Sequence, residues 1–120
     1  NRHIINRESI AKMRDGVVIV NCSRGELADI EALIEGIETG KIGALGMDTV
    51  EGDEGIIHAD HRGDILPNRN WFCLHQFRNV IMTQHMAFYT EQAVASMVQR
   101  GVEGLVKMAE EGSYKTMLNK

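Results

Sequence analysis

The fold is decided by residues 16–49, which read GVVIVNCSRGELADIEALIEGIETGKIGALGMDT. Val17-Val18-Ile19-Val20 is an unbroken β-branched run, typical of a parallel strand that is buried on both faces. Asp29 can cap the helix that follows, whose apolar residues recur at the spacing of one face: Ile30, Leu33, Ile34 and Ile37. Gly40 ends this helix, and residues 41–43 lead into a weaker strand over residues 44–48. The stretch therefore predicts a strand–helix–strand unit.

The residues on either side continue this alternation. Asn6 can cap a short helix that runs through Met13 and stops at Gly16, with Ile5 and Ile10 placed as a hydrophobic staple. Residues 80–83, Val-Ile-Met-Thr, predict a third strand. Strands that alternate with helices at this spacing form right-handed βαβ units and a parallel sheet. The predicted fold class is therefore α/β.

Two further segments complete the chain. Thr90 can cap a long helix ending near Glu111, whose apolar face is formed by Val94, Met97, Val98, Val102, Leu105, Val106 and Ala109. The connection between Val50 and Asn79 is longer than an ordinary loop, and residues 71–77 predict a short helix inside it. Long loops at the carboxyl edge of a parallel sheet are where α/β proteins place their chemistry.

The composition excludes several classes of protein. The net charge of −4 and the absence of a Lys/Arg cluster argue against a nucleic-acid partner. No apolar run approaches the length of a membrane span, and two cysteines without a pairing pattern favour a reducing compartment. Potential metal ligands are present (His58, Asp60, His61, Cys73 and His75), but their spacing matches no zinc pattern. We therefore predict a cytoplasmic protein with no membrane partner and no metal site.

Polar residues follow each of the three predicted strands. Residues 21–26 follow the first, residues 48–54 the second and residues 84–90 the third. Because the carboxyl ends of parallel strands share one edge, Arg24, an acidic residue near position 53 and His85 can converge in one crevice. Arg grips a carboxylate in two parallel hydrogen bonds, and His transfers a proton near neutral pH, helped by a neighbouring carboxylate. Each residue alone also fits a solvated surface role, and only the three together favour a catalytic site.

Three motifs follow one another along the chain: VIVNCSRG (residues 18–25), GMDTVEG (46–52) and HMAFYT (85–90). Together they resemble the D-2-hydroxyacid dehydrogenase family, in particular its D-lactate and D-2-hydroxyisocaproate dehydrogenase branch. The resemblance implies a Rossmann-like, doubly wound sheet and NAD-dependent hydride transfer to a 2-oxo acid such as pyruvate. It implies that Arg24 binds the substrate carboxylate and that His85 is the acid–base residue. It places the cofactor against Asn1, Cys22, Ser23, Arg24 and Asp48, and the substrate side chain against Phe88.

The chain departs from the family pattern at one catalytic position. The acidic partner of the catalytic histidine is usually Glu in this family, and the matching residue here is Asp53, which is one methylene shorter. We predict that Asp53 fills this role, and its neighbour Glu54 is the alternative.

The resemblance also implies a division of the chain. Residues 1–89 correspond to the second half of an NAD-binding domain, and residues 90–120 to a helix that returns toward a substrate domain. The Gly-x-Gly-x-x-Gly turn that holds the pyrophosphate does not occur in the 120 residues, so the chain alone is expected to be an inactive fragment of a homodimeric enzyme. Three alternatives remain: a bulkier 2-oxo acid such as phenylpyruvate or 2-oxoisocaproate, a nucleotide-sensing interaction module, and a fragment with no function of its own.

Overall fold

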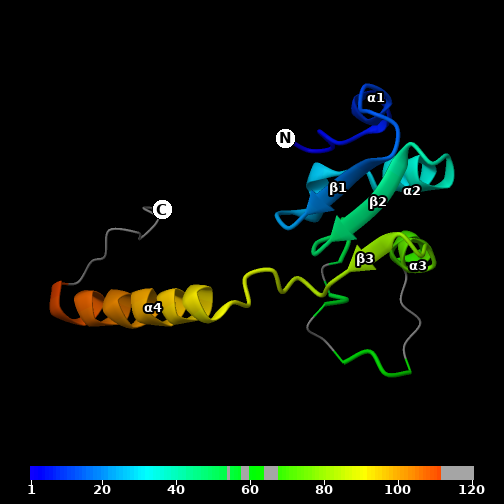
Figure 1. Cartoon of the computed structure of the whole chain (residues 1–120). Coiled ribbons are helices and arrows are strands. Elements are labelled where there is room, and N and C mark those ends of the chain that lie inside the picture. The colour runs from blue at the N-terminus through cyan, green and yellow to red at the C-terminus, as the bar shows by residue number, and fades with distance from the viewer. Residues whose placement is uncertain (54, 58–59, 64–67, 112–120) are drawn as a thin grey trace. The chain divides into compact units, whose positions relative to one another are not determined.

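The computed structural model describes residues 1–53, 55–57, 60–63 and 68–111, and divides the chain into two compact units, Asn1–Ala87 and Phe88–Lys120 (Figure 1). The first unit contains α1 (Arg7–Ala11), β1 (Val17–Asn21), a 3₁₀ turn (Gly25–Leu27), α2 (Ile30–Glu38), β2 (Ile42–Met47), α3 (Arg69–His75) and β3 (Val80–Met82). The second unit contains α4 (Glu91–Glu111). Within the described residues no helix is both long and apolar enough to cross a membrane.

The three strands form one parallel sheet in the order β1–β2–β3, which confirms the predicted α/β class. The register pairs Asn21 with Met47 and Met47 with Met82, so the carboxyl ends of the three strands are level. The loops that follow the strands therefore begin at one edge of the sheet.

The helices form where the sequence supplies caps. Asn6 and Ser9 make a capping box at the start of α1, and the Asp29 carboxylate accepts hydrogen bonds from the Glu31 and Ala32 N–H groups at the start of α2. The Thr90 hydroxyl accepts a hydrogen bond from the Ala93 N–H, as predicted for α4. Helix α1 ends at Ala11, two residues before the predicted Met13, because residues 12–16 form the turn into β1.

The bounds of the later elements also shift by a few residues. Strand β2 begins at Ile42, two residues earlier than predicted. The Ile42 side chain is fully buried in the core, where it packs against α2. Helix α3 begins at Arg69, since the Asn68 side chain caps it by accepting a hydrogen bond from the Trp71 N–H. The first shift follows from a packing contact that local sequence does not show, whereas the Asn68 cap is a local signal that the sequence prediction overlooked.

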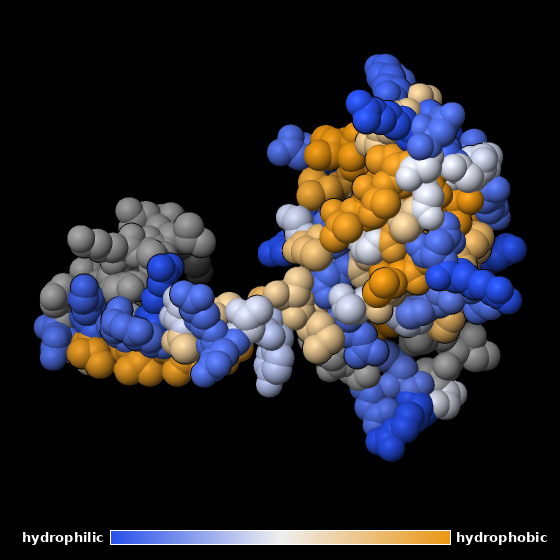
Figure 2. Space-filling model, in the orientation of Figure 1, coloured by the Kyte–Doolittle hydropathy of each residue, from blue (hydrophilic) through white to orange (hydrophobic). Residues whose placement is uncertain are grey.

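The prediction that the first strand is buried on both faces was wrong for this chain. Val18 and Val20 of β1 are 64% and 67% exposed, and Ile81 of β3 is 72% exposed. The core lies on the other face of the sheet, where it is built from Ile10, Ala28, Ile30, Ala32, Leu33, Ile37, Ile42, Leu45, Met47, Val50 and Leu74. Helices α1, α2 and α3 all contribute to this one core, so apolar surface remains over the strands (Figure 2).

Candidate functional site

The carboxyl edge of the sheet carries the predicted site residues of the first unit. Arg24 lies just after β1, Asp48 directly after β2, and His85 three residues after β3. Neighbouring strands lie about 5 Å apart, so the loops after β1 and β3 begin about 10 Å apart with the end of β2 between them. The edge therefore brings a cation, a carboxylate and an imidazole to neighbouring positions.

Asp48 is the most fully engaged of these residues. Only 4% of it is exposed, and its Oδ1 accepts hydrogen bonds from the Thr83 hydroxyl and from the Met86 N–H at 2.8 Å. Its Oδ2 accepts the Ala87 N–H at 2.8 Å, and its backbone carbonyl accepts the His85 N–H, also at 2.8 Å. Burial raises the pKa of Asp48, but these hydrogen bonds and the charge of His85 outweigh it, so the net pKa lies below its ordinary value.

These bonds fix the backbone that carries His85. His85 has φ of 52°, in the left-handed region that residues other than glycine seldom adopt. Three successive N–H groups, of His85, Met86 and Ala87, point at Asp48 and hold this conformation. A non-glycine residue held in this region by its surroundings is a common feature of functional sites.

Asp53 ends the turn of residues 50–53, which lies in the loop that follows β2. The turn is closed by two hydrogen bonds, from the Asp53 N–H to the Val50 carbonyl (3.1 Å) and from the Val50 N–H to Asp53 Oδ2 (3.0 Å). Asp53 is thus anchored on Val50 and His85 on Asp48, two residues of the same loop that are separated only by Thr49. Glu54, the alternative partner of His85, lies outside the described residues.

The loop after β1 is preformed and exposed. The Asn21 side chain accepts a hydrogen bond from the Ser23 N–H (3.1 Å) and donates one to the Arg24 carbonyl (2.8 Å), which closes the loop over Cys22 and Ser23. The Arg24 guanidinium is exposed and donates to the Ser23 carbonyl at 2.8 Å. A fixed polar loop at this edge is suited to contact a nucleotide or a substrate carboxylate.

Asn1 and Phe88 are the other two predicted residues within the described part of the chain. Asn1 is exposed at the start of the chain, and Phe88 and Tyr89 belong to the second unit, where their rings meet edge to face. Sequence reasoning missed Thr83 and the pairing of Glu51 with the N-terminal segment. The only local signal for Thr83 was a hydroxyl residue at the end of a strand. Glu51 gave no local signal, because its partners Arg2 and His3 are separated from it by 49 and 48 positions in the sequence.

Other parts of the unit offer less chemistry. A cavity of about 300 Å³ lies between α1 and α2, but the cations at its rim are already paired, Arg7 with Glu35 at 2.6 Å and Lys41 with Asp15 at 2.7 Å. Among the described residues, no three His, Cys, Asp or Glu side chains are grouped as a metal site would require. Cys22 and Cys73 are both unpaired thiols.

The fold and the site define a Rossmann-like α/β domain that places an arginine, a buried aspartate and a histidine at the carboxyl edge of its sheet. Residues 1–87 match the family described as "D-isomer specific 2-hydroxyacid dehydrogenase, NAD binding domain". The chain belongs to this family.

Its relatives include an aromatic 2-oxoacid reductase from Clostridium sporogenes, 42% identical over 115 residues, which are 96% of this chain and 35% of the relative. A D-lactate dehydrogenase from Lactobacillus delbrueckii subsp. bulgaricus is 44% identical over 110 residues, which are 92% of this chain and 33% of that protein. The solved structure of a D-lactate dehydrogenase from Sporolactobacillus superposes with a TM-score of 0.90 at 31% identity, covering 99% of this chain and 36% of that chain. The chain thus spans about a third of the length of the curated relatives it matches.

Proposed function

We propose that this chain supplies the acid–base histidine and the substrate-binding arginine of an NAD-dependent D-2-hydroxyacid dehydrogenase. The observation that carries the proposal is the carboxyl edge of the sheet, where Arg24 and His85 follow the two outer strands and Asp48, between them, holds the His85 backbone. Membership of the family and the names of the relatives support the same reaction.

The side chains suit reduction of a 2-oxo acid. The Arg24 guanidinium has a planar fork of N–H donors that matches a carboxylate, and its long side chain can span part of the distance between the outer strands. The carbonyl oxygen of the substrate then lies beside His85, whose imidazolium donates a proton to it as the carbonyl carbon accepts a hydride. Asp53 orients the imidazole and stabilises its charged form. The product is the 2-hydroxy acid.

The residues present fit the nicotinamide end of a dinucleotide. Bound NADH would supply the hydride. The loop of residues 22–24, held from Asn21, offers polar groups at the edge where α/β proteins bind nucleotides. Asn1 and Asp48 would complete this contact, although both Asp48 oxygens already accept hydrogen bonds from the protein. The pyrophosphate cradle of glycine N–H groups has no counterpart in the 120 residues, so the chain alone should bind NAD weakly or not at all.

The substrate is pyruvate or a bulkier 2-oxo acid. The relatives named D-lactate dehydrogenase and aromatic 2-oxoacid reductase are about equally similar to this chain, at 44% and 42% identity. Phe88 is the residue of this chain that the resemblance places in the side-chain pocket. We further propose that the complete enzyme is cytoplasmic and that it is a homodimer. Light scattering after size-exclusion chromatography would test the homodimer.

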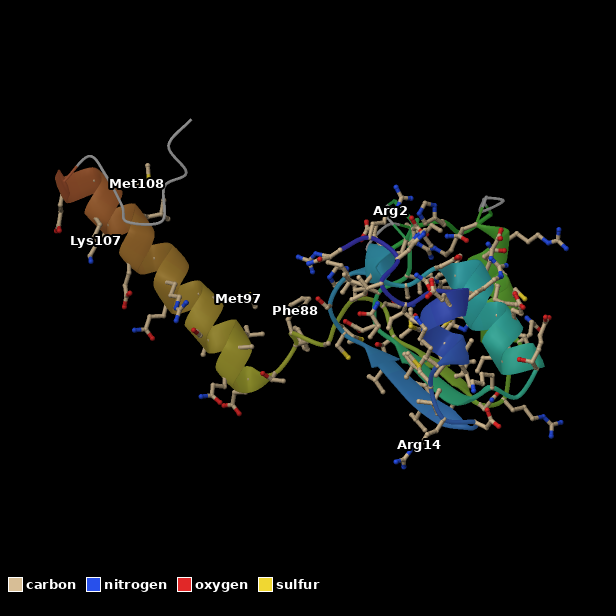
Figure 3. All side chains as sticks on the ribbon, turned by 90° about the horizontal axis from the view of Figure 1, so that it is seen from above. Arg2, Arg14, Phe88, Met97, Lys107 and Met108 are labelled. Carbon is tan, nitrogen blue, oxygen red and sulfur yellow. The ribbon has the colours of Figure 1, made fainter. Side chains whose placement is uncertain are left out.

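The function is tested by NADH oxidation with the complete gene product that carries these residues, against pyruvate, 2-oxoisocaproate and phenylpyruvate. The 120-residue chain is assayed in parallel. We expect turnover by the gene product and none by the chain. Substitutions R24M and H85Q should abolish turnover, whereas R14M should retain it, because Arg14 precedes the opposite, amino end of β1 (Figure 3). A wild-type gene product inert on all three acids would favour the nucleotide-sensing alternative.

A further inference from the structure

Three separate segments meet beside the turn that carries Asp53. The N-terminal segment runs alongside the loop after β1, with hydrogen bonds from the His3 N–H to the Glu26 carbonyl (2.8 Å) and from the Ile5 N–H to the Leu27 carbonyl (3.0 Å). The same loop touches the turn after β2, since a Cβ built on Gly25 would lie 2.2 Å from the Val50 carbonyl carbon. These segments are far apart in sequence and are brought together only by the fold.

A charged cluster links the N-terminal segment directly to this turn. The Glu51 carboxylate accepts hydrogen bonds from Arg2 Nη2 at 2.5 Å and from His3 Nε2 at 2.7 Å, and we call these three residues the Glu51 cluster. Glu51 is partly buried, with 22% of its side chain exposed. The bond from His3 holds the pKa of Glu51 below its ordinary value; partial burial opposes this lowering and Arg2 adds to it. Glu51 therefore carries its charge at neutral pH.

The geometry of the Glu51 cluster requires an unusual backbone. His3 has φ of 52°, and it shares with His85 the left-handed conformation that non-glycine residues seldom adopt. This conformation lets the His3 N–H bond to Glu26 while its ring bonds to Glu51. A strained residue with two bonds to two different loops indicates a fixed position rather than a solvated surface pair.

Other restraints on this turn come from its own residues and its neighbours: the Asp53 carbonyl accepts the Ile56 and Ile57 N–H groups at 2.9 and 3.2 Å. The turn contains Gly52 with φ of 78°, and it is closed by the two hydrogen bonds between Val50 and Asp53. From outside, the Asn68 side chain donates to the Glu51 and Gly52 carbonyls at the longer distances of 3.3 and 3.2 Å. Among the described residues, the two bonds to the Glu51 carboxylate are the shortest side-chain hydrogen bonds made to this turn.

We propose that Glu51 is a positioning residue of the acid–base site: held by Arg2 and His3, it fixes the turn of residues 50–53, and with it Asp53, against the segment that begins at Asn1. The restraint follows from contacts within this chain. Its catalytic consequence rests on the proposed function, because that function gives Asp53 its role beside His85 and Asn1 its role beside the cofactor.

The restraint is tested in the 120-residue chain by amide hydrogen exchange, which does not depend on activity. We expect E51Q and H3Q to speed exchange of the Asp53 and Val50 amides about fivefold, with the β2 amides unchanged. The matched control is E8Q, which breaks the exposed pair between Glu8 and Lys12 within one turn at α1. If E51Q also speeds exchange of the β2 amides, the proposal is judged on the H3Q variant alone, because H3Q keeps the bond between Arg2 and Glu51. Unchanged protection of both turn amides would overturn the proposal.

The catalytic consequence is tested in the complete gene product by a double-mutant cycle. E51Q should lower the pH at which 2-oxo-acid reduction falls off, in the same direction as D53N, with kcat reduced more than KM for the 2-oxo acid is raised. The E51Q/D53N variant should show no larger shift than D53N alone, because Glu51 acts through Asp53. A shift equal to the sum of the two single shifts would contradict the proposal. Since the exchange result stands whether or not the protein reduces 2-oxo acids, failure of the restraint and failure of the function are distinguishable.

Discussion

At the scale of single residues, Asp48 does the most to organise the site. Its two carboxylate oxygens accept three hydrogen bonds from residues 83–87, all of which follow β3 in sequence. An asparagine offers one acceptor oxygen in place of two, so D48N should leave a buried N–H group unsatisfied. We expect D48N to lower the free energy of unfolding by about 1–3 kcal/mol, measured by urea titration. The E8Q variant, altered in an exposed ion pair, should unfold at the wild-type urea concentration.

The same carboxylate should make stability depend on pH. Because its pKa is lower in the folded protein than the ordinary value of 3.8, the Asp48 contribution is fully present above that value. It is lost as pH falls through the folded-state pKa. The difference in unfolding free energy between wild type and D48N should therefore be constant from pH 7 to about pH 5 and shrink as the pH falls below about 4. A difference that grows on acidification would show that charged Asp48 is not the acceptor of these hydrogen bonds in the folded protein.

We propose that Asp53 fills the position at which the family resemblance leads us to expect a glutamate beside the catalytic histidine. In the complete gene product, D53N should lower the pH at which reduction falls off, because a carboxylate favours the protonated imidazole that donates the proton. The measurement is kcat/KM for pyruvate from pH 5 to 9, with E35Q as a control, since Glu35 pairs with Arg7 between α1 and α2. A profile unchanged by D53N but shifted by E54Q would give the role to Glu54.

At the scale of elements, close approach between loops decides which glycines are required. Gly25 opens the 3₁₀ turn and lies against the Val50–Glu51 backbone, where a Cβ would come within 2.3 Å of the Glu51 nitrogen. G25A should therefore destabilise the first unit by about 2–3 kcal/mol, because backbone cannot move aside as a side chain can. G101A provides the contrast, since nothing lies within 4 Å of that position in α4. G101A should raise the helix content seen in circular dichroism spectra. An equal loss of stability in G25A and G101A would show that the close approach at Gly25 does not require a glycine.

Local signals predicted the helices better than the strands. Asn6, Asp29 and Thr90 cap α1, α2 and α4 through bonds to amides two or three residues away, and such bonds leave a mark in the sequence. The burial of β1 does not depend on its own residues. Val18 and Val20 have the composition of a fully buried strand, yet their exposure depends on what covers that face of the sheet.

At the scale of the whole molecule, α4 exposes a continuous apolar stripe. Val98, Val102 and Leu105 are each more than half exposed, and the stripe runs along one side of the helix (Figure 2). Covering such a stripe is favourable, so the 120-residue chain should associate with itself as its concentration rises. Sedimentation velocity should show a mean mass that rises with concentration for the wild-type chain. The rise should be smaller for V102E/L105E. The S96E variant, changed on the polar side of the helix, should behave as wild type.

By itself the sequence determined the α/β class, the order of helices and strands, and the identity of Arg24, Asp53 and His85 as candidates. Caps, apolar periodicity and motif residues act over a few positions and are therefore visible in one dimension. Only the tertiary structure decided that Asp48 holds the His85 backbone, that Glu51 bonds to Arg2 and His3, and that one face of the sheet is exposed. The physical reason is that these contacts join residues 35 to 49 positions apart, so which residues meet depends on how distant segments pack together rather than on local sequence.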